Sequence, residues 1–91
     1  MQIKWTSKAQ SDLARLYEFL ACVNRSAAVR AVRALTDAPR ALLANPRIGE
    51  KLEEFEPREV RRILVGKYEV RYEIQATNIY LLRLWHTRED R

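Results

Sequence analysis

The chain has 91 residues, enough for one core and little spare stability, so we expect residues 1–91 to form a single domain. A hydrophobic share of 47% and only two glycines and three prolines exclude a disordered or low-complexity chain. The single cysteine, Cys22, excludes an internal disulfide and a cysteine-rich metal site. With only one histidine there is no second ligand beside it, so we expect neither a metal nor a cofactor.

The net charge of +5 favours an acidic partner, which would be nucleic acid or an acidic protein surface. The N-terminus, Met1-Gln2-Ile3-Lys4-Trp5, has no apolar signal core, and no apolar run approaches the length of a membrane span. We therefore expect a soluble cytoplasmic protein.

The first half of the chain predicts a short strand followed by two helices. The strand is Ile3-Lys4-Trp5, and Ser7 is expected to cap a helix that runs from about Lys8 to Ala21. Asn24 begins a second helix, in which Pro39 predicts a kink or a split because proline lacks a backbone donor. The short link between the helices predicts an antiparallel hairpin. Apolar residues recur at helical spacing at Ala9, Leu13, Leu16, Tyr17 and Leu20, and then at Ala28, Val32, Leu35, Ala38 and Leu42.

The second half predicts a polar loop over residues 50–57 and then three strands joined as a meander. The strands are Val60–Val65, Tyr68–Gln75 and Ile79–His86, with Gly66-Lys67 as the first tight turn. The order is therefore β-α-α-β-β-β. It predicts a two-layer α+β fold in which the helical hairpin packs on one face of a mostly antiparallel four-stranded sheet.

The last strand is apolar on both faces, so its one charge, Arg83, decides its orientation. A charge belongs away from the core, which sends Ile79, Leu81, Arg83 and Trp85 outward and Tyr80, Leu82, Leu84 and His86 inward. A three-residue turn at Ala76-Thr77-Asn78 would place Arg71 opposite Arg83, Glu69 opposite Trp85 and Tyr68 opposite His86. A two-residue turn would reverse the faces, and we favour the longer turn. The outer face would then be bare and apolar, which is typical of an interaction site.

Four segments, WTSKAQSDLARLYEFL, NPRIG, KYEVRYEI and IYLLRLWHTRED, resemble the RelE/ParE superfamily of type II toxin–antitoxin modules in their order and spacing. The resemblance implies a RelE/ParE-like fold and a small basic toxin that forms a hetero-oligomer with a cognate acidic antitoxin. Two activities occur in the superfamily. RelE-like members are ribosome-dependent mRNA endoribonucleases, and ParE-like members inhibit DNA gyrase without nuclease activity.

The residue after Tyr68 favours the ParE-like branch. The resemblance implies that members of the nuclease branch have an arginine directly after this tyrosine. This chain has Glu69 there, whose carboxylate would repel a scissile phosphate. The sequence also ends without the terminal tyrosine of many nuclease members. We therefore expect an inhibitor of DNA gyrase that acts by binding and not by chemistry.

The alternative is a ribosome-dependent mRNA endoribonuclease whose candidate catalytic residues are Arg61, Arg71, His86 and Arg88. A plain nucleic-acid-binding domain is a weaker third hypothesis, because no base-stacking pair or recognition helix is present.

The candidate partner-binding residues lie on the second helix, on the outer face of the sheet and near the C-terminus. They are Arg30, Arg33, Arg71, Arg83, Trp85 and Arg88. Glu69 and Glu73 flank Arg71 on the same face and are expected to offset the repulsion between Arg71 and Arg83. His86 is expected to be a structural residue beside Tyr68.

Overall fold

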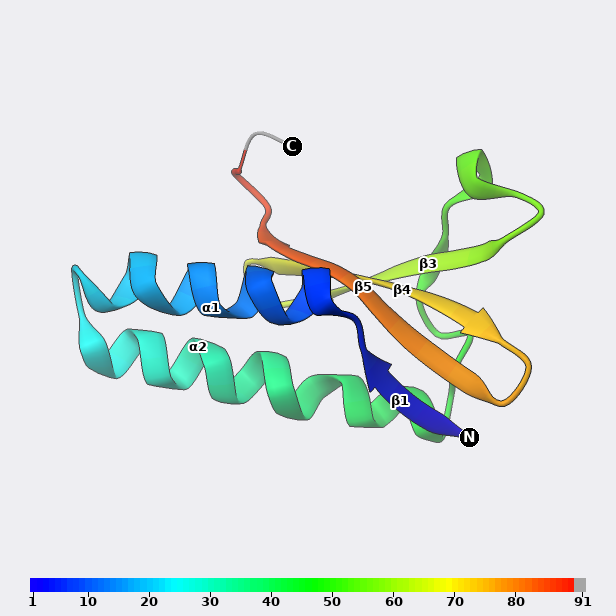
Figure 1. Ribbon diagram of the computed structural model, residues 1–91, viewed down its shortest axis with the longest axis horizontal. Coiled ribbons are helices and arrows are strands. Elements are labelled where there is room, and N and C mark those ends of the chain that lie inside the picture. Colours follow the sequence, from blue (N-terminus) through cyan, green and yellow to red (C-terminus); the bar gives the residue numbers. More distant parts are fainter. Residues whose placement is uncertain (90–91) are drawn as a thin grey trace.

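The structure, a computed structural model, describes residues 1–89 and arranges them in two layers, a helical hairpin and a twisted sheet (Figure 1). The elements in chain order are β1 (Gln2–Trp5), α1 (Ser7–Ala21), α2 (Arg25–Asp37), the 3₁₀ helix η1 (Ala38–Leu43), β2 (Glu50–Lys51), the 3₁₀ helix η2 (Glu53–Phe55), β3 (Glu59–Val65), β4 (Tyr68–Gln75) and β5 (Asn78–His86). The strand order is β1-β5-β4-β3-β2, with β1 and β5 parallel and the other pairs antiparallel. The predicted α+β class is confirmed. The short edge strand β2 makes five strands where four were predicted, because it pairs with β3 within the segment expected as a loop.

The helix boundaries are close to the prediction, but the first cap is a different residue. Thr6, not Ser7, is the N-cap of α1. Its hydroxyl accepts a hydrogen bond from the Ala9 N–H at 3.2 Å and donates one to the Leu81 carbonyl at 2.7 Å. Asn24 caps α2 as predicted, with its side-chain oxygen 3.1 Å from the Ala27 nitrogen. None of the helices within residues 1–89 is long and apolar enough to span a bilayer.

Pro39 splits the second helix, as predicted. The α-helix ends at Asp37, and the chain continues as the 3₁₀ helix η1, in which Pro39 lies in the first turn. In the first turn of a helix the backbone N–H groups have no acceptor within the helix, so the missing N–H of proline costs no hydrogen bond there. The split lets η1 contact β1, so that Leu42 joins the core.

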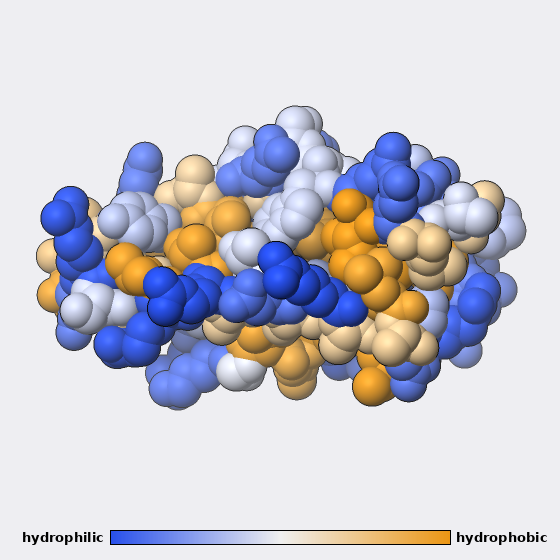
Figure 2. Space-filling view, turned by 90° about the horizontal axis from the view of Figure 1, so that it is seen from below, coloured by the Kyte–Doolittle hydropathy of each residue, from blue (hydrophilic) through white to orange (hydrophobic). Residues whose placement is uncertain are grey.

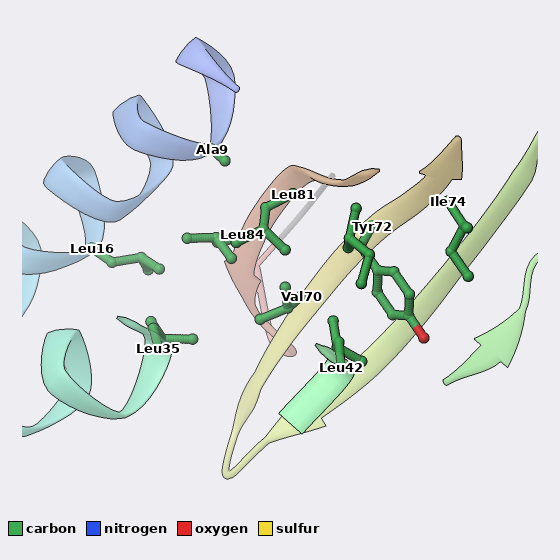
Figure 3. Packing of buried hydrophobic residues seen from close by; sticks show 10 residues of the cluster. Ala9, Leu16, Leu35, Leu42, Val70, Tyr72, Ile74, Leu81 and Leu84 are labelled. Carbon is green, nitrogen blue, oxygen red and sulfur yellow. The ribbon is translucent and has the colours of Figure 1, made fainter. Parts of the chain in front are cut away.

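The core lies between the helical hairpin and one face of β4 and β5. Figure 3 shows Leu16 of α1, Leu35 of α2 and Leu42 of η1 pointing toward side chains of the two strands. The buried cluster consists of Ala9, Leu16, Leu35, Leu42, Val70, Tyr72, Ile74, Ile79, Leu81 and Leu84.

The faces of β5 follow from a short turn and a β-bulge. Gln75 lies opposite Asn78, so the turn has two residues and the predicted three-residue turn is wrong. Close to the turn, Ile79 and Leu81 therefore face the core, contrary to the prediction that they point outward. A register shift then places Leu82 as the extra residue of a bulge, which moves the pairing by one residue.

Beyond the bulge the predicted cross-strand pairs are confirmed. Arg71 lies opposite Arg83, Glu69 opposite Trp85 and Tyr68 opposite His86. The bulge supplies the residue that the short turn lacks, so the register at this end of β5 is the one expected from a longer turn. Leu84 accordingly points inward and Arg83 outward, as predicted.

The outer face of the sheet, meaning the face away from the helices, is not bare. Val60 of β3 belongs to this face because it pairs with Glu73, and it is fully buried. The segment that contains η2 folds over it, and the Leu52 N–H donates a hydrogen bond to the Val60 carbonyl at 2.8 Å. The expectation of an open apolar face is therefore wrong.

The loop before β2 is fixed to the sheet by Tyr72. The Tyr72 hydroxyl donates to the Pro46 carbonyl at 2.7 Å and accepts from the Gly49 N–H at 3.1 Å. A Cβ atom at Gly49 would lie 2.6 Å from this hydroxyl and 2.6 Å from the Arg62 carbonyl, so only glycine allows this approach.

We predict that Gly49→Ala destabilises the protein by about 1–3 kcal/mol, because the added methyl group overpacks the contact with Tyr72. Thermal unfolding followed by circular dichroism measures this as a lowered Tm. The neighbouring variant Ile48→Ala is the control, since Ile48 is exposed and its truncation should leave Tm almost unchanged. Equal melting of Gly49→Ala and wild type would contradict the account of this loop.

Candidate functional site: the arginine row on the outer face

Three arginines stand side by side across the outer face of the sheet. Arg62 of β3 pairs with Arg71 of β4, and Arg71 pairs with Arg83 of β5. We call Arg62, Arg71 and Arg83 the arginine row. Like charges directly opposite one another destabilise a sheet, so the row requires nearby carboxylates.

Glu69 forms ion pairs with Arg62 and Arg71, the first two residues of the arginine row. Its side chain is 2% exposed, with Oε1 3.3 Å from Arg62 and Oε2 3.1 Å from Arg71. Arg62 makes a second ion pair at 2.8 Å with Glu50 on β2. The prediction that Glu69 offsets the charge of Arg71 is confirmed.

Asp12 of α1 forms an ion pair with Arg83, the third residue of the arginine row. Its Oδ2 accepts from Arg83 Nε at 2.7 Å and from the Leu84 N–H at 2.9 Å, and its Oδ1 lies 3.2 Å from Arg83 Nη2. Burial by itself would raise the pKa of Asp12, but the bonds from Arg83 and from the Leu84 N–H outweigh burial and lower this pKa below its ordinary value. Asp12 therefore remains a carboxylate and ties the helical layer to β5.

Asp12 is not among the residues predicted for the site, although its position in the sequence carries a signal. Asp12 comes three residues after Ala9 and four before Leu16, so it lies on the buried stripe of α1. A carboxylate on an apolar stripe needs a cation or several donors in the core. Arg83 and the Leu84 N–H are those donors.

Aromatic rings contact the guanidinium groups of the outer face. Trp85 contacts both Arg71 and Arg83, with its ring centre 4.8 Å and 5.5 Å from the two guanidinium carbons. Phe55 of η2 lies 5.5 Å from Arg71 and 6.0 Å from Arg58. Trp85 is only 6% exposed, which corrects the expectation that it presents an open apolar surface. The two flanking guanidinium groups cover its ring by cation–π contact.

Glu73 compensates Arg58 and not Arg71. Its two carboxylate oxygens accept from Arg58 at 2.7 and 3.1 Å in a bidentate pair, and these bonds lower the pKa of the Glu73 carboxyl below its usual value. Each arginine of the outer face thus has a carboxylate partner. This surface has no excess positive charge with which to bind a phosphate group.

The four residues considered for catalysis are not brought together. Arg61 pairs with Tyr72 and so belongs to the face that carries the helices, where it donates to the Gly49 carbonyl at 2.8 Å and to Glu59 at 3.0 Å. Arg71 lies on the opposite face. His86 and Arg88 do lie together, at the end of β5.

His86 contacts Tyr68, as predicted. The two rings meet edge to face with their centres 5.3 Å apart, and His86 Nδ1 accepts the Arg88 N–H at 3.1 Å. This bond closes the turn that follows β5. His86 is partly exposed and borders a hollow beside α1.

The arginines of the second helix differ from those of the sheet. Arg30 and Arg33 are exposed, and among residues 1–89 neither has an ion pair. The same holds for Arg25 and Arg40. The uncompensated positive charge is therefore concentrated on α2 and η1.

We predict that Asp12→Asn lowers the free energy of unfolding at neutral pH by about 2 kcal/mol, because the variant loses a charge-assisted buried bond to Arg83. The folded-state pKa of Asp12 lies below its unfolded value. Its stabilisation is therefore complete above the unfolded pKa, near 3.8, and is lost as pH falls through the folded pKa. Urea unfolding at pH 7 and at pH 3 measures the difference from wild type, which should shrink at pH 3. Asp37→Asn, at an exposed position, is the control. A difference of the same size at both pH values would contradict the role of the charge.

A family model matches the sequence, and a solved structure has a similar fold. The family model described as "ParE toxin of type II toxin-antitoxin system, parDE" matches residues 3–91. A solved structure titled "Chromosomal ParDE TA system from P. aeruginosa" is similar, with a TM-score of 0.77 and 22% sequence identity over 94% of this chain and 95% of that chain. At this identity the likeness shows the fold. No curated protein matches the chain. Because the family model spans almost the whole sequence, the chain belongs to the ParE toxin family of type II toxin–antitoxin systems.

Proposed function

We propose that this toxin inhibits DNA gyrase by binding to it, and that a cognate acidic antitoxin neutralises the toxin. The observation that carries this proposal is the compensation of the arginine row. Cleaving RNA without a metal needs a cation that is free to stabilise the phosphorane, together with a base and an acid. Arg62, Arg71 and Arg83 are each held by a carboxylate, and Glu69 stands among them. A toxin that acts by binding alone does not require a free cation on the sheet.

One observation favours the second candidate, cleavage of ribosome-bound mRNA. Tyr68, His86 and Arg88 border one hollow at the end of β5, and these side chains have the chemistry of an acid, a base and a cation. Glu89 borders the same hollow, and its carboxylate opposes the approach of a phosphate. We therefore keep gyrase inhibition as the main proposal.

We propose that the antitoxin lies along α2 and η1. A groove lined by Tyr17, Val29, Val32, Arg33, Thr36 and Asp37 runs between the two helices. Thr36 also borders a second hollow, of about 470 Å³, which includes Ile3 of β1 and Leu43 of η1. Figure 2 shows this side of the molecule, with hydrophobic patches interrupted by a band of hydrophilic side chains. An acidic segment with alternate apolar side chains would match both the grooves and the arginines of α2.

For Arg71, Arg83 and Trp85 we propose a supporting part in partner binding. Arg71 and Arg83 both contact the Trp85 ring, and the exposed part of Arg83 would contact a partner at the rim of an interface. Arg30, Arg33 and Arg88 are free of carboxylates within residues 1–89, which makes them better candidates for direct ionic contacts.

We predict that Arg33→Glu slows association with the antitoxin by roughly threefold or more at low salt and flattens its salt dependence, since long-range attraction steers the encounter. Stopped-flow binding to the cognate antitoxin measures both effects. Lys67→Glu is the matched control, because Lys67 is an exposed cation that belongs to the β3–β4 turn and not to α2. An association rate that Arg33→Glu leaves unchanged at every salt concentration would remove α2 from the antitoxin path.

The two candidate functions are separated by two assays on the same purified wild-type toxin. We expect it to inhibit DNA supercoiling by purified gyrase and to leave ribosome-bound mRNA intact. Added antitoxin should restore supercoiling. Cleavage of ribosome-bound mRNA that is absent from the His86→Gln variant would contradict the proposal and establish the nuclease alternative.

A further inference from the structure

A hollow of about 490 Å³ lies beside α1 at the end of β5. Leu16, Phe19 and Leu20 of α1 line one side of it, and Tyr68 and His86 line another. Figure 1 places the segment that follows β5 on the side of α1 away from α2. The hollow is therefore separate from the α2 face to which we assigned the antitoxin.

The wall that α1 contributes is unusually apolar for an open surface. Phe19 is 69% exposed at the rim of the hollow, while Leu16 behind it is almost fully buried. A large exposed ring next to a concave apolar surface is typical of a binding site, since such surface is costly to leave in water. The volume suits one or two side chains of a protein partner.

The polar groups of the hollow are mainly hydrogen-bond donors. Nδ1 of His86 is occupied by the Arg88 N–H, so Nε2 carries the proton of the neutral ring. Burial, followed by the charge of Glu89, raises the pKa of the Tyr68 phenol, which therefore keeps its proton. The carboxylate of Glu89 is engaged by Arg15 and by the His86 N–H.

Arg88 is the free cation of the hollow. Within residues 1–89 its guanidinium has no carboxylate partner, whereas Arg15 is paired with Glu89. An apolar wall with donors and one free cation at its edge is complementary to an apolar side chain that has a carboxylate next to it.

We propose that this hollow is the contact site for gyrase and that it receives an apolar side chain of gyrase together with a neighbouring Asp or Glu that pairs with Arg88. The inference rests on the proposed function and names the surface that performs it. A nucleic-acid strand fits less well, because it needs several free cations and the hollow offers one. The antitoxin fits less well, because the four uncompensated arginines of α2 and η1 lie elsewhere.

The test compares two variants with wild type in binding to purified gyrase and to the antitoxin. Phe19→Ala removes an exposed ring, and Arg88→Gln removes the free charge. We expect roughly tenfold weaker binding to gyrase for Phe19→Ala and a severalfold loss for Arg88→Gln. Antitoxin affinity should remain within about twofold of wild type for both. Leu64→Ala is the matched control, since Leu64 is an equally exposed apolar residue on the outer face. Thermal melts establish that each variant is folded.

Four results would overturn the inference. If both folded variants bind gyrase as tightly as wild type, the inference is wrong while the proposed function stands. If wild type does not bind gyrase, the proposed function fails, and gyrase as the occupant fails with it. If the variants lose antitoxin as much as gyrase, the hollow belongs to the antitoxin path. If wild type cleaves ribosome-bound mRNA and Arg88→Gln does not, the hollow is an active site.

Discussion

The ion pair between Asp12 and Arg83 connects the two layers of this protein. It joins the buried stripe of α1 to the outer edge of β5, and the Leu84 N–H adds a third bond to the same carboxylate. Without an anion at this place, Arg83 would stand opposite Arg71 without a carboxylate partner of its own, and Glu69 would be left to offset the repulsion alone. Breaking a buried pair costs more than the pair contributes, because one desolvated charge is left without a partner. The arrangement of the sheet therefore depends on a residue of the helix.

The same compensation divides the positive charge of the chain into two groups. The arginines of the sheet are neutralised by carboxylates that are themselves buried, such as Glu69 and Glu73. The arginines of α2 and η1 have no such partners within the described residues. The helices therefore carry a cluster of unpaired arginines within the described residues, which can attract an acidic protein over a distance. The sheet surface, although rich in arginine, is nearly neutral, and this is why its composition is a poor guide to nucleic-acid binding.

Much of the fold could be predicted from periodicity and from turn residues. The Asn24 cap, the split at Pro39 and the Gly66-Lys67 turn each follow from local chemistry, and each is present. Residues whose role depends on tertiary contacts were missed. Thr6 and Ser7 are adjacent hydroxyl residues, and the choice between them follows from the bond that Thr6 makes to β5.

The candidate site was harder to predict than the fold. The bulge at Leu82 leaves no mark in the alternation of a strand that is apolar on both faces, so Ile79 and Leu81 were assigned to the wrong side. The Arg71–Arg83 pair was nonetheless correct, because the short turn and the bulge compensate each other. The shielding of Trp85 required knowing that both neighbours would stack on its ring, and the part played by Asp12 required its distance from Arg83.

Carboxylates immobilise the sheet arginines, whereas the arginines of α2 remain free within the described residues. NMR of the arginine Nε–Hε groups at neutral pH distinguishes the two groups, because a guanidinium that is bound to a carboxylate exchanges its protons slowly with water. We expect slow exchange at Arg83 and Arg58, fast exchange at Arg30 and Arg33, and loss of the slow Arg83 signal in Asp12→Asn. Exchange at Arg83 as fast as at Arg30 would contradict the account.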